Sequence, residues 1–206
     1  LDLFFASGHL NAVSGDNRQF NLLFENDGWG RFSDISEQAG VEATKKRIHR
    51  SAIFADYDND GLVDIYVTNN GQQVEDGKGN TINDPFQGVG ILYHNETKST
   101  NNWLKIKLEG SKSNRDGYGA KVKLSAGDLV STQSLISGIG YFSTNAKELY
   151  FGLGQIKQID ELEVTWPSGE IQNFNKIALN QTVYIVEGGI LHPNTTMLSE
   201  KNIPKK

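Results

Sequence analysis

The segment ADYDNDGLVDIYVTN, residues 55–69, is the part of the chain whose residue types could do chemistry. Within nine positions it carries four aspartates, which are Asp56, Asp58, Asp60 and Asp64. Carboxylates at this spacing repel one another unless a cation lies between them. Calcium takes six to eight hard oxygen ligands in irregular geometry, so carboxylates on alternate residues of a tight turn can converge on it. The spacing therefore predicts a calcium site.

The ligand set expected for this site comprises the four aspartates and the main-chain carbonyl of Leu62, and Gly61 would allow the sharp bend. The spacing resembles an EF-hand loop, but Val67 stands where the bidentate glutamate would be, and a strand pattern follows in place of a helix. Magnesium keeps its waters and demands octahedral geometry, and transition metals favour His or Cys. The alternative is a polar turn whose aspartates bond only to backbone. The sequence favours a structural calcium loop inside a β-hairpin.

An internal repeat surrounds this loop. LDLFFASG, residues 1–8, parallels VDIYVTNN, residues 63–70, and NLLFEN, residues 21–26, parallels GILYHN, residues 90–95. In this register Asp2 matches Asp64. We therefore expect the chain to begin inside an upstream copy and to be the C-terminal part of a longer repeat protein. Residues 71–88 form a polar insertion in the second copy.

The rest of the chain is typical of an all-β protein. Glycine is abundant at 22 residues, proline is scarce at 4, and short alternating runs are bounded by turn residues. In WLKIKLEG, Leu104, Ile106 and Leu108 share one face, and Lys105 and Lys107 share the other. DELEVTWPSGEIQNF, residues 160–174, predicts a hairpin with its turn at PSG.

These patterns predict a repeat region over residues 1–100 and a second β-domain over residues 101–188, followed by a polar tail over residues 189–206. The second domain is expected to be a sandwich or a barrel-like fold.

Composition excludes several classes of protein. A net charge of −5 disfavours nucleic acid as a partner, and the absence of cysteine excludes disulfides, thiolate zinc sites and cysteine nucleophiles. No apolar run is long enough to span a bilayer. No catalytic signature is present, so we expect no enzyme and no catalytic residues. Trp29, in the turn DGWGRF, is the aromatic side chain most expected to be exposed, whereas Trp103 and Trp166 are expected to pack.

Two known families share these motifs. FADYDNDGLVDIYVTN and LLFENDGWGRFSDISEQAG resemble the calcium loop and hairpin of FG-GAP/VCBS repeats in integrin-like β-propellers. NWLKIKLEGSKSNRDGYGAKV, SGIGYFS, LYFGLG and IDELEVTWPSGEIQ resemble the UnbV/ASPIC domain, which follows such repeats in proteins of the cartilage acidic protein type. The resemblance implies partial propeller blades, a bound Ca²⁺ and no catalysis.

The function expected from the resemblance is a calcium-binding interaction module outside the cell, in the periplasm or at the outer membrane. Its partner would be a protein or a glycan, and further propeller blades would lie upstream. Two alternatives stay open: an accessory C-terminal region of an exported enzyme or of an enediyne-type biosynthesis protein, and a glycan-binding module.

Overall fold

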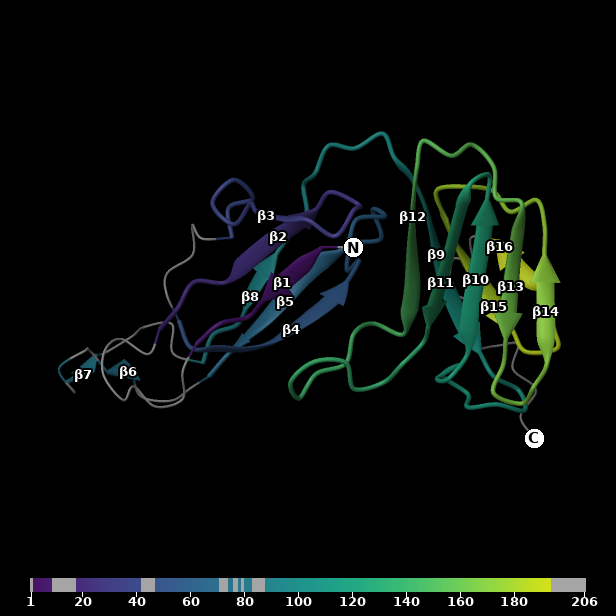
Figure 1. Ribbon diagram of the computed structural model, residues 1–206. Helices are drawn as coiled ribbons and strands as arrows, with labels where there is room; N and C mark the ends of the chain where they lie inside the picture. The colour runs from purple at the N-terminus through teal and green to yellow at the C-terminus, as the bar shows by residue number, and fades with distance from the viewer. Residues whose placement is uncertain are drawn as a thin grey trace. The chain divides into compact units, whose positions relative to one another are not determined.

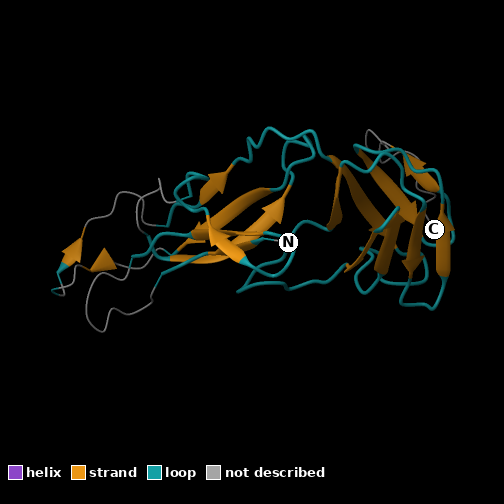
Figure 2. Ribbon diagram, turned by 45° about the horizontal axis from the view of Figure 1, so that its top comes forward, coloured by secondary structure: helices purple, strands orange, loops and turns teal. Residues whose placement is uncertain are grey.

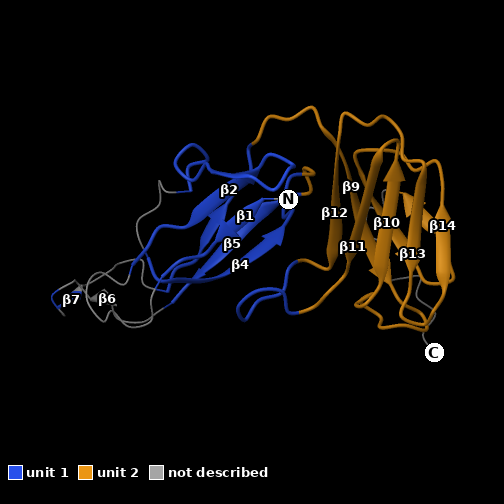
Figure 3. Ribbon diagram, viewed as in Figure 1, with its two compact units in different colours: residues 1–58, 62–96, 138–145 blue, residues 59–61, 97–137, 146–206 orange. Residues whose placement is uncertain are grey.

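The computed structural model describes residues 2–8, 18–41, 47–70, 74–75, 78, 80–82 and 88–193. These residues contain strands and no helix, as Figure 2 shows, which confirms the all-β prediction. They form two compact units (Figure 3). The first unit comprises residues up to 58, residues 62–96 and residues 138–145, and the second comprises residues 59–61, residues 97–137 and the chain from residue 146.

The first unit contains two three-stranded antiparallel sheets and a short strand pair (Figure 1). One sheet has the order β1 (Leu3–Phe5), β2 (Leu22–Asn26), β3 (Phe32–Asp34). The other has the order β4 (His49–Ala55), β5 (Asp64–Asn69), β8 (Ile91–Tyr93). Strands β6 (Val74–Glu75) and β7 (Thr81–Ile82) pair within the predicted insertion, most of which lies outside the described residues.

The two sheets repeat the same strand register. Leu3 on β1 faces Phe24 on β2, and Ile65 on β5 faces Tyr93 on β8. In the sequence repeat, Leu3 corresponds to Ile65 and Phe24 corresponds to Tyr93. The two copies therefore share their structure as well as their sequence, with β1 and β2 in one copy equivalent to β5 and β8 in the next.

Phe4 connects the two sheets of the first unit. Its ring packs edge-on against Phe54 and Tyr93, with centroid distances of 6.4 and 5.9 Å. On the opposite face of its sheet, Leu3 and Phe5 are exposed. Strand alternation places the two faces on opposite sides, so the first sheet has one packed face and one open apolar face.

Residues 138–145 belong to the first unit although they come much later in the chain. Ser51 Oγ donates a hydrogen bond to the carbonyl of Tyr141, and the Phe54 amide donates to Asn145 Oδ1 over 3.2 Å. The segment therefore covers part of β4, which is an edge strand of its sheet.

The second unit contains two four-stranded sheets. One has the order β11 (Leu129–Ser134), β10 (Lys121–Ala126), β13 (Glu161–Thr165), β14 (Ile171–Phe174). The other has the order β12 (Glu148–Gly154), β9 (Asn102–Glu109), β15 (Gln181–Val186), β16 (Leu191–Pro193). β15 runs parallel to β9, and all other pairs are antiparallel.

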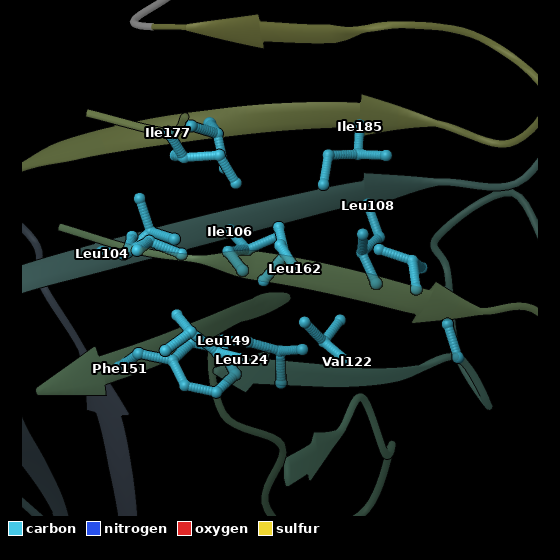
Figure 4. Packing of buried hydrophobic residues seen from close by; sticks show 14 of the residues in the cluster. Leu104, Ile106, Leu108, Val122, Leu124, Leu149, Phe151, Leu162, Ile177 and Ile185 are labelled. Atoms are coloured by element: carbon cyan, nitrogen blue, oxygen red, sulfur yellow. The ribbon is translucent and has the colours of Figure 1, made fainter. Parts of the chain in front are cut away.

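The inner faces of these two sheets enclose one core. Figure 4 shows Leu104, Ile106, Val122, Leu124 and Leu162 pointing into it from three strands. All five side chains are fully buried. The arrangement is a β-sandwich, which settles the choice between sandwich and barrel-like fold within this unit.

Three local predictions for the second domain have different outcomes. The PSG hairpin is confirmed: β13 and β14 pair, and Gly169 closes the turn with a φ of 90°. Lys105 was predicted on the polar face, but its side chain is fully buried and its Nζ lies 3.8 Å from a Glu148 oxygen. The predicted polar tail from residue 189 contains strand β16 at residues 191–193, and residues 194–206 lie outside the described residues.

Candidate metal centre

The predicted calcium loop connects β4 to β5. The two strands are antiparallel, with Ala55 opposite Asp64, so the aspartates lie at the closed end of a hairpin. Asn59 and Gly61 have positive φ angles of 63° and 92°, the conformation in which Asn and Gly are tolerated best. The sequence therefore folds this segment into a tight turn whose two ends are fixed by a strand pair.

Three of the predicted ligands lie together within the first unit. One carboxylate oxygen each of Asp56, Asp58 and Asp64 lies within 4.8 Å of the other two. Asp56 and Asp64 are buried, with 6% and 2% of their surface exposed. Burying carboxylates this close together is unfavourable without a compensating positive charge.

The donor set fits calcium. Calcium–oxygen distances are about 2.3–2.6 Å, so two oxygens on one ion lie no more than about 5 Å apart. The spacing within the group of three meets this limit. All three donors are hard carboxylate oxygens, which calcium prefers. Their assignment as metal ligands stays a prediction.

Asp64 is oriented by backbone donors on both of its oxygens. The Tyr57 amide donates to Oδ2 over 3.1 Å, and the Asn95 amide donates to Oδ1 over 2.8 Å. In the first repeat copy the Asn26 amide donates to Asp2 Oδ1 over 2.9 Å. Asp2 matches Asp64 and Asn26 matches Asn95, so the same hydrogen bond joins equivalent residues in both copies. This contact fixes one end of the loop against the strand that closes the sheet.

His94 is a site residue that sequence reasoning missed. Its Nε2 lies 3.1 Å from Asp58 Oδ2, and its ring meets that of Tyr57 edge-on with centroids 5.6 Å apart. A nitrogen ligand does not suit calcium, so we assign His94 the role of holding the Asp58 carboxylate. Its place in GILYHN, the repeat segment that also contains Asn95, is the signal that could have found it.

Asp60 is not one of these three carboxylates. It is exposed and lies in the segment 59–61, which belongs to the second unit. Leu62, whose main-chain carbonyl is the fifth predicted ligand, is partly buried, and its role stays a prediction. In the segment 59–61 Gly61 is sterically required, because an added Cβ would lie 2.2 Å from Cε2 of Trp103. The glycine that the sequence assigned to the bend is therefore also fixed by packing.

Trp29 is a second candidate contact residue, and the prediction that it is exposed is confirmed. Its side chain is 89% exposed. Hydrogen bonds hold the backbone of the turn that carries it: Asn26 Oδ1 accepts the Gly28 amide over 2.8 Å, and Asp27 Oδ1 accepts the Trp29 amide over 2.7 Å. The Asn26 and Asp27 side chains thus order the backbone of the turn, and the exposed indole projects from it.

Comparison with protein families finds one match in each part of the chain. Residues 1–67 match the FG-GAP-like repeat family, and residues 110–191 match the ASPIC and UnbV family. Both families are those that the sequence motifs resemble. A comparison with curated proteins gives no match. Across the described residues, no helix has the length and apolar character needed to cross a membrane.

Proposed function

Because the chain combines an FG-GAP-like repeat region with an ASPIC and UnbV domain, we propose that it is a non-catalytic, calcium-binding interaction module of the cell exterior or the cell envelope. Both are domain types without catalytic activity of their own, and FG-GAP repeats are typically found in extracellular or periplasmic proteins. The finer assignments of calcium and of the outer-membrane or periplasmic location are our inference.

The observation that carries the proposal is the group of three carboxylates at the closed end of the β4–β5 hairpin. A bound calcium ion would neutralise the repulsion among Asp56, Asp58 and Asp64. The chain's own groups prepare the site: Asn95 and Tyr57 orient Asp64, and His94 holds Asp58. The ion would therefore stabilise the hairpin, and its role is structural.

The first unit also has the surfaces that a repeat module needs for contact with partners. Leu3 and Phe5 are exposed on one side of the β1 sheet, and Tyr66 and Leu92 are exposed on the β4–β5–β8 sheet. Apolar sheet faces of this kind are covered by a neighbouring sheet in a propeller. We propose that further blades, and a protein or glycan partner, complete this unit in the full-length protein.

Glycan binding is a second candidate function, and the exposed Trp29, which lies on a hydrogen-bonded turn, favours it. An indole offers a large flat face at low conformational cost. A glycan array with wild type and Trp29→Ala tests this candidate. Binding that disappears in the variant supports it, and a flat wild-type array counts against it. The alternative of an accessory region of an exported enzyme stays a prediction.

Thermal unfolding with calcium and with chelator tests the leading proposal. A ligand that binds only the native state adds about 2.7 kcal/mol at one hundred times its Kd, which moves the transition by several degrees. We expect this shift in wild type and in the control Glu37→Ala, which changes an exposed carboxylate of the first unit. We expect no shift in Asp56→Ala/Asp60→Ala. Equal transitions with calcium and chelator in wild type would refute the calcium assignment.

A further inference from the structure

A polar hollow on the second unit has the size of a ligand site. Its volume is about 540 Å³, within the range of about 300 to 1,000 Å³ that is usual for small-molecule sites. It is lined by the end of β9, by part of the loop between β9 and β10, and by Lys147 and Tyr184. Leu108 is the one aliphatic residue in the lining, so an apolar ligand is a poor fit.

Most charged groups of the lining already have partners. Lys147 Nζ lies 2.6 Å from Asp116 Oδ2, and the Tyr184 hydroxyl donates to the Glu109 carboxylate. Lys107 Nζ lies 2.6 Å from a carboxylate oxygen of β12. These pairs hold the side chains that line the hollow in place, and the charges of the paired groups are already neutralised by their partners.

Two neighbouring hydrogen-bond donors of the lining, on Arg115 and Asn114, are not engaged in such pairs. Within the described part of the chain, the guanidinium of Arg115 has no ion pair and no hydrogen bond. Asn114 Oδ1 accepts the Asp116 amide over 3.0 Å, which turns the Asn114 NH₂ group away from that bond and leaves it available. The groups free to meet a ligand are therefore both hydrogen-bond donors, and one of them is permanently cationic.

The loop that presents these donors is rigid. The Gly110 amide donates to the Arg115 carbonyl over 3.1 Å, and the amides of Ser111, Lys112 and Ser113 all donate to one oxygen of Glu187. Gly117, where the loop returns, has a φ of 72°. The backbone that carries these donors is therefore already ordered, so binding a ligand costs mainly the rotamer freedom of the two side chains.

We propose that this hollow binds an acidic sugar unit through its carboxylate. A guanidinium matches a carboxylate bidentately, and the adjacent Asn114 amide supplies a further donor. The carboxylates of Asp116 and Glu109 retain lone pairs that accept hydrogen bonds from sugar hydroxyls. A polyhydroxylated anion uses both kinds of group, whereas a simple anion uses the donors alone. The site involves no residue of the calcium loop.

Isothermal titration of the whole chain with digalacturonate tests the proposal, with maltose as a neutral disaccharide. The test variant is Arg115→Gln, and the matched control is Lys123→Gln, which removes an exposed cation from β10 of the same unit. We expect digalacturonate to bind wild type and the control alike, and maltose not to bind. Loss of a charged hydrogen-bond pair should weaken binding to Arg115→Gln by about tenfold or more. Circular dichroism should show all three proteins folded.

Two further measurements separate this site from others. Asp58→Asn, which changes a predicted calcium ligand, should bind digalacturonate like wild type, so failure of the calcium proposal would leave this one standing. Inorganic sulfate and phosphate should compete weakly. Equal binding of sulfate and digalacturonate would overturn the assignment to a sugar, and equal binding to Arg115→Gln and wild type would overturn the site.

Discussion

Glu187 gives the sharpest quantitative prediction for the second unit. Its side chain is 3% exposed and accepts five hydrogen bonds. Three come from successive backbone amides at 2.7–2.8 Å, and two come from the hydroxyls of Ser113 and Ser168 at 2.8 and 2.5 Å. Burial disfavours the charged form, but the hydrogen bonds from Ser113, Ser168 and Lys112 outweigh it and lower the pKa of Glu187 to about 2. The carboxylate therefore holds the loop that carries Arg115.

Replacing Glu187 by Gln keeps the shape and removes the charge. A hydrogen bond to a charged group is worth about 1.5–3 kcal/mol and a neutral one about 0.5–1.5. Since the five bonds share one carboxylate and are not additive, we expect a loss of roughly 2–3 kcal/mol in unfolding free energy at neutral pH. Urea unfolding measures this loss. Hydrogen exchange at the amides of residues 111–113 should also be faster in the variant.

The pH dependence tests the same interaction independently. The folded pKa of Glu187 is depressed from 4.5, so its stabilising contribution is complete above about pH 4.5 and is lost as the pH falls toward 2. The stability difference between wild type and Glu187→Gln should therefore shrink across this window. A difference that stays constant from pH 7 to pH 3, or no difference at neutral pH, would refute the assigned role.

Three further predictions concern buried or strained positions. Burial and the neighbouring arginines lower the pKa of His49 to about 4, so the first unit should lose stability as the pH falls from 6.5 to 4, and His49→Gln should flatten that slope in thermal unfolding. Gly61→Ala should lower the unfolding temperature more than Gly127→Ala, because an added Cβ at Gly61 meets Trp103 whereas at Gly127 it meets nothing. Leu162→Ala, at a fully buried core position, should cost about 2–5 kcal/mol in urea unfolding.

The fold followed from the sequence wherever the pattern was local. The alternation of apolar and polar residues correctly predicted that Leu104, Ile106 and Leu108 lie in the core. The two pairs of similar sequence segments were enough to align Asp2 with Asp64. That alignment carries real structural information, because both residues accept the same hydrogen bond from equivalent asparagine amides. Local periodicity and repeat order are properties of the chain itself, so they can be found without coordinates.

What sequence reasoning missed depends on partners far apart in the chain. Lys105 alternates like a surface residue, yet it is buried beside Glu148, which comes from another strand. His94 lies 36 positions from Asp58, and only strand pairing brings the two together. No sequence pattern in residues 138–145 indicates that they belong to the first unit. Such pairings are set by tertiary contacts, which a one-dimensional pattern does not specify.

Terbium luminescence tests directly whether the aspartates of the β4–β5 hairpin bind calcium, because Tyr57 lies between Asp56 and Asp58 and can sensitise an ion bound there. We predict sensitised emission that calcium displaces in wild type and in Asp128→Asn, an exposed change in the second unit. Emission should be lost in Asp58→Asn. Equal emission from Asp58→Asn and wild type, or emission that calcium does not displace, would contradict the calcium assignment.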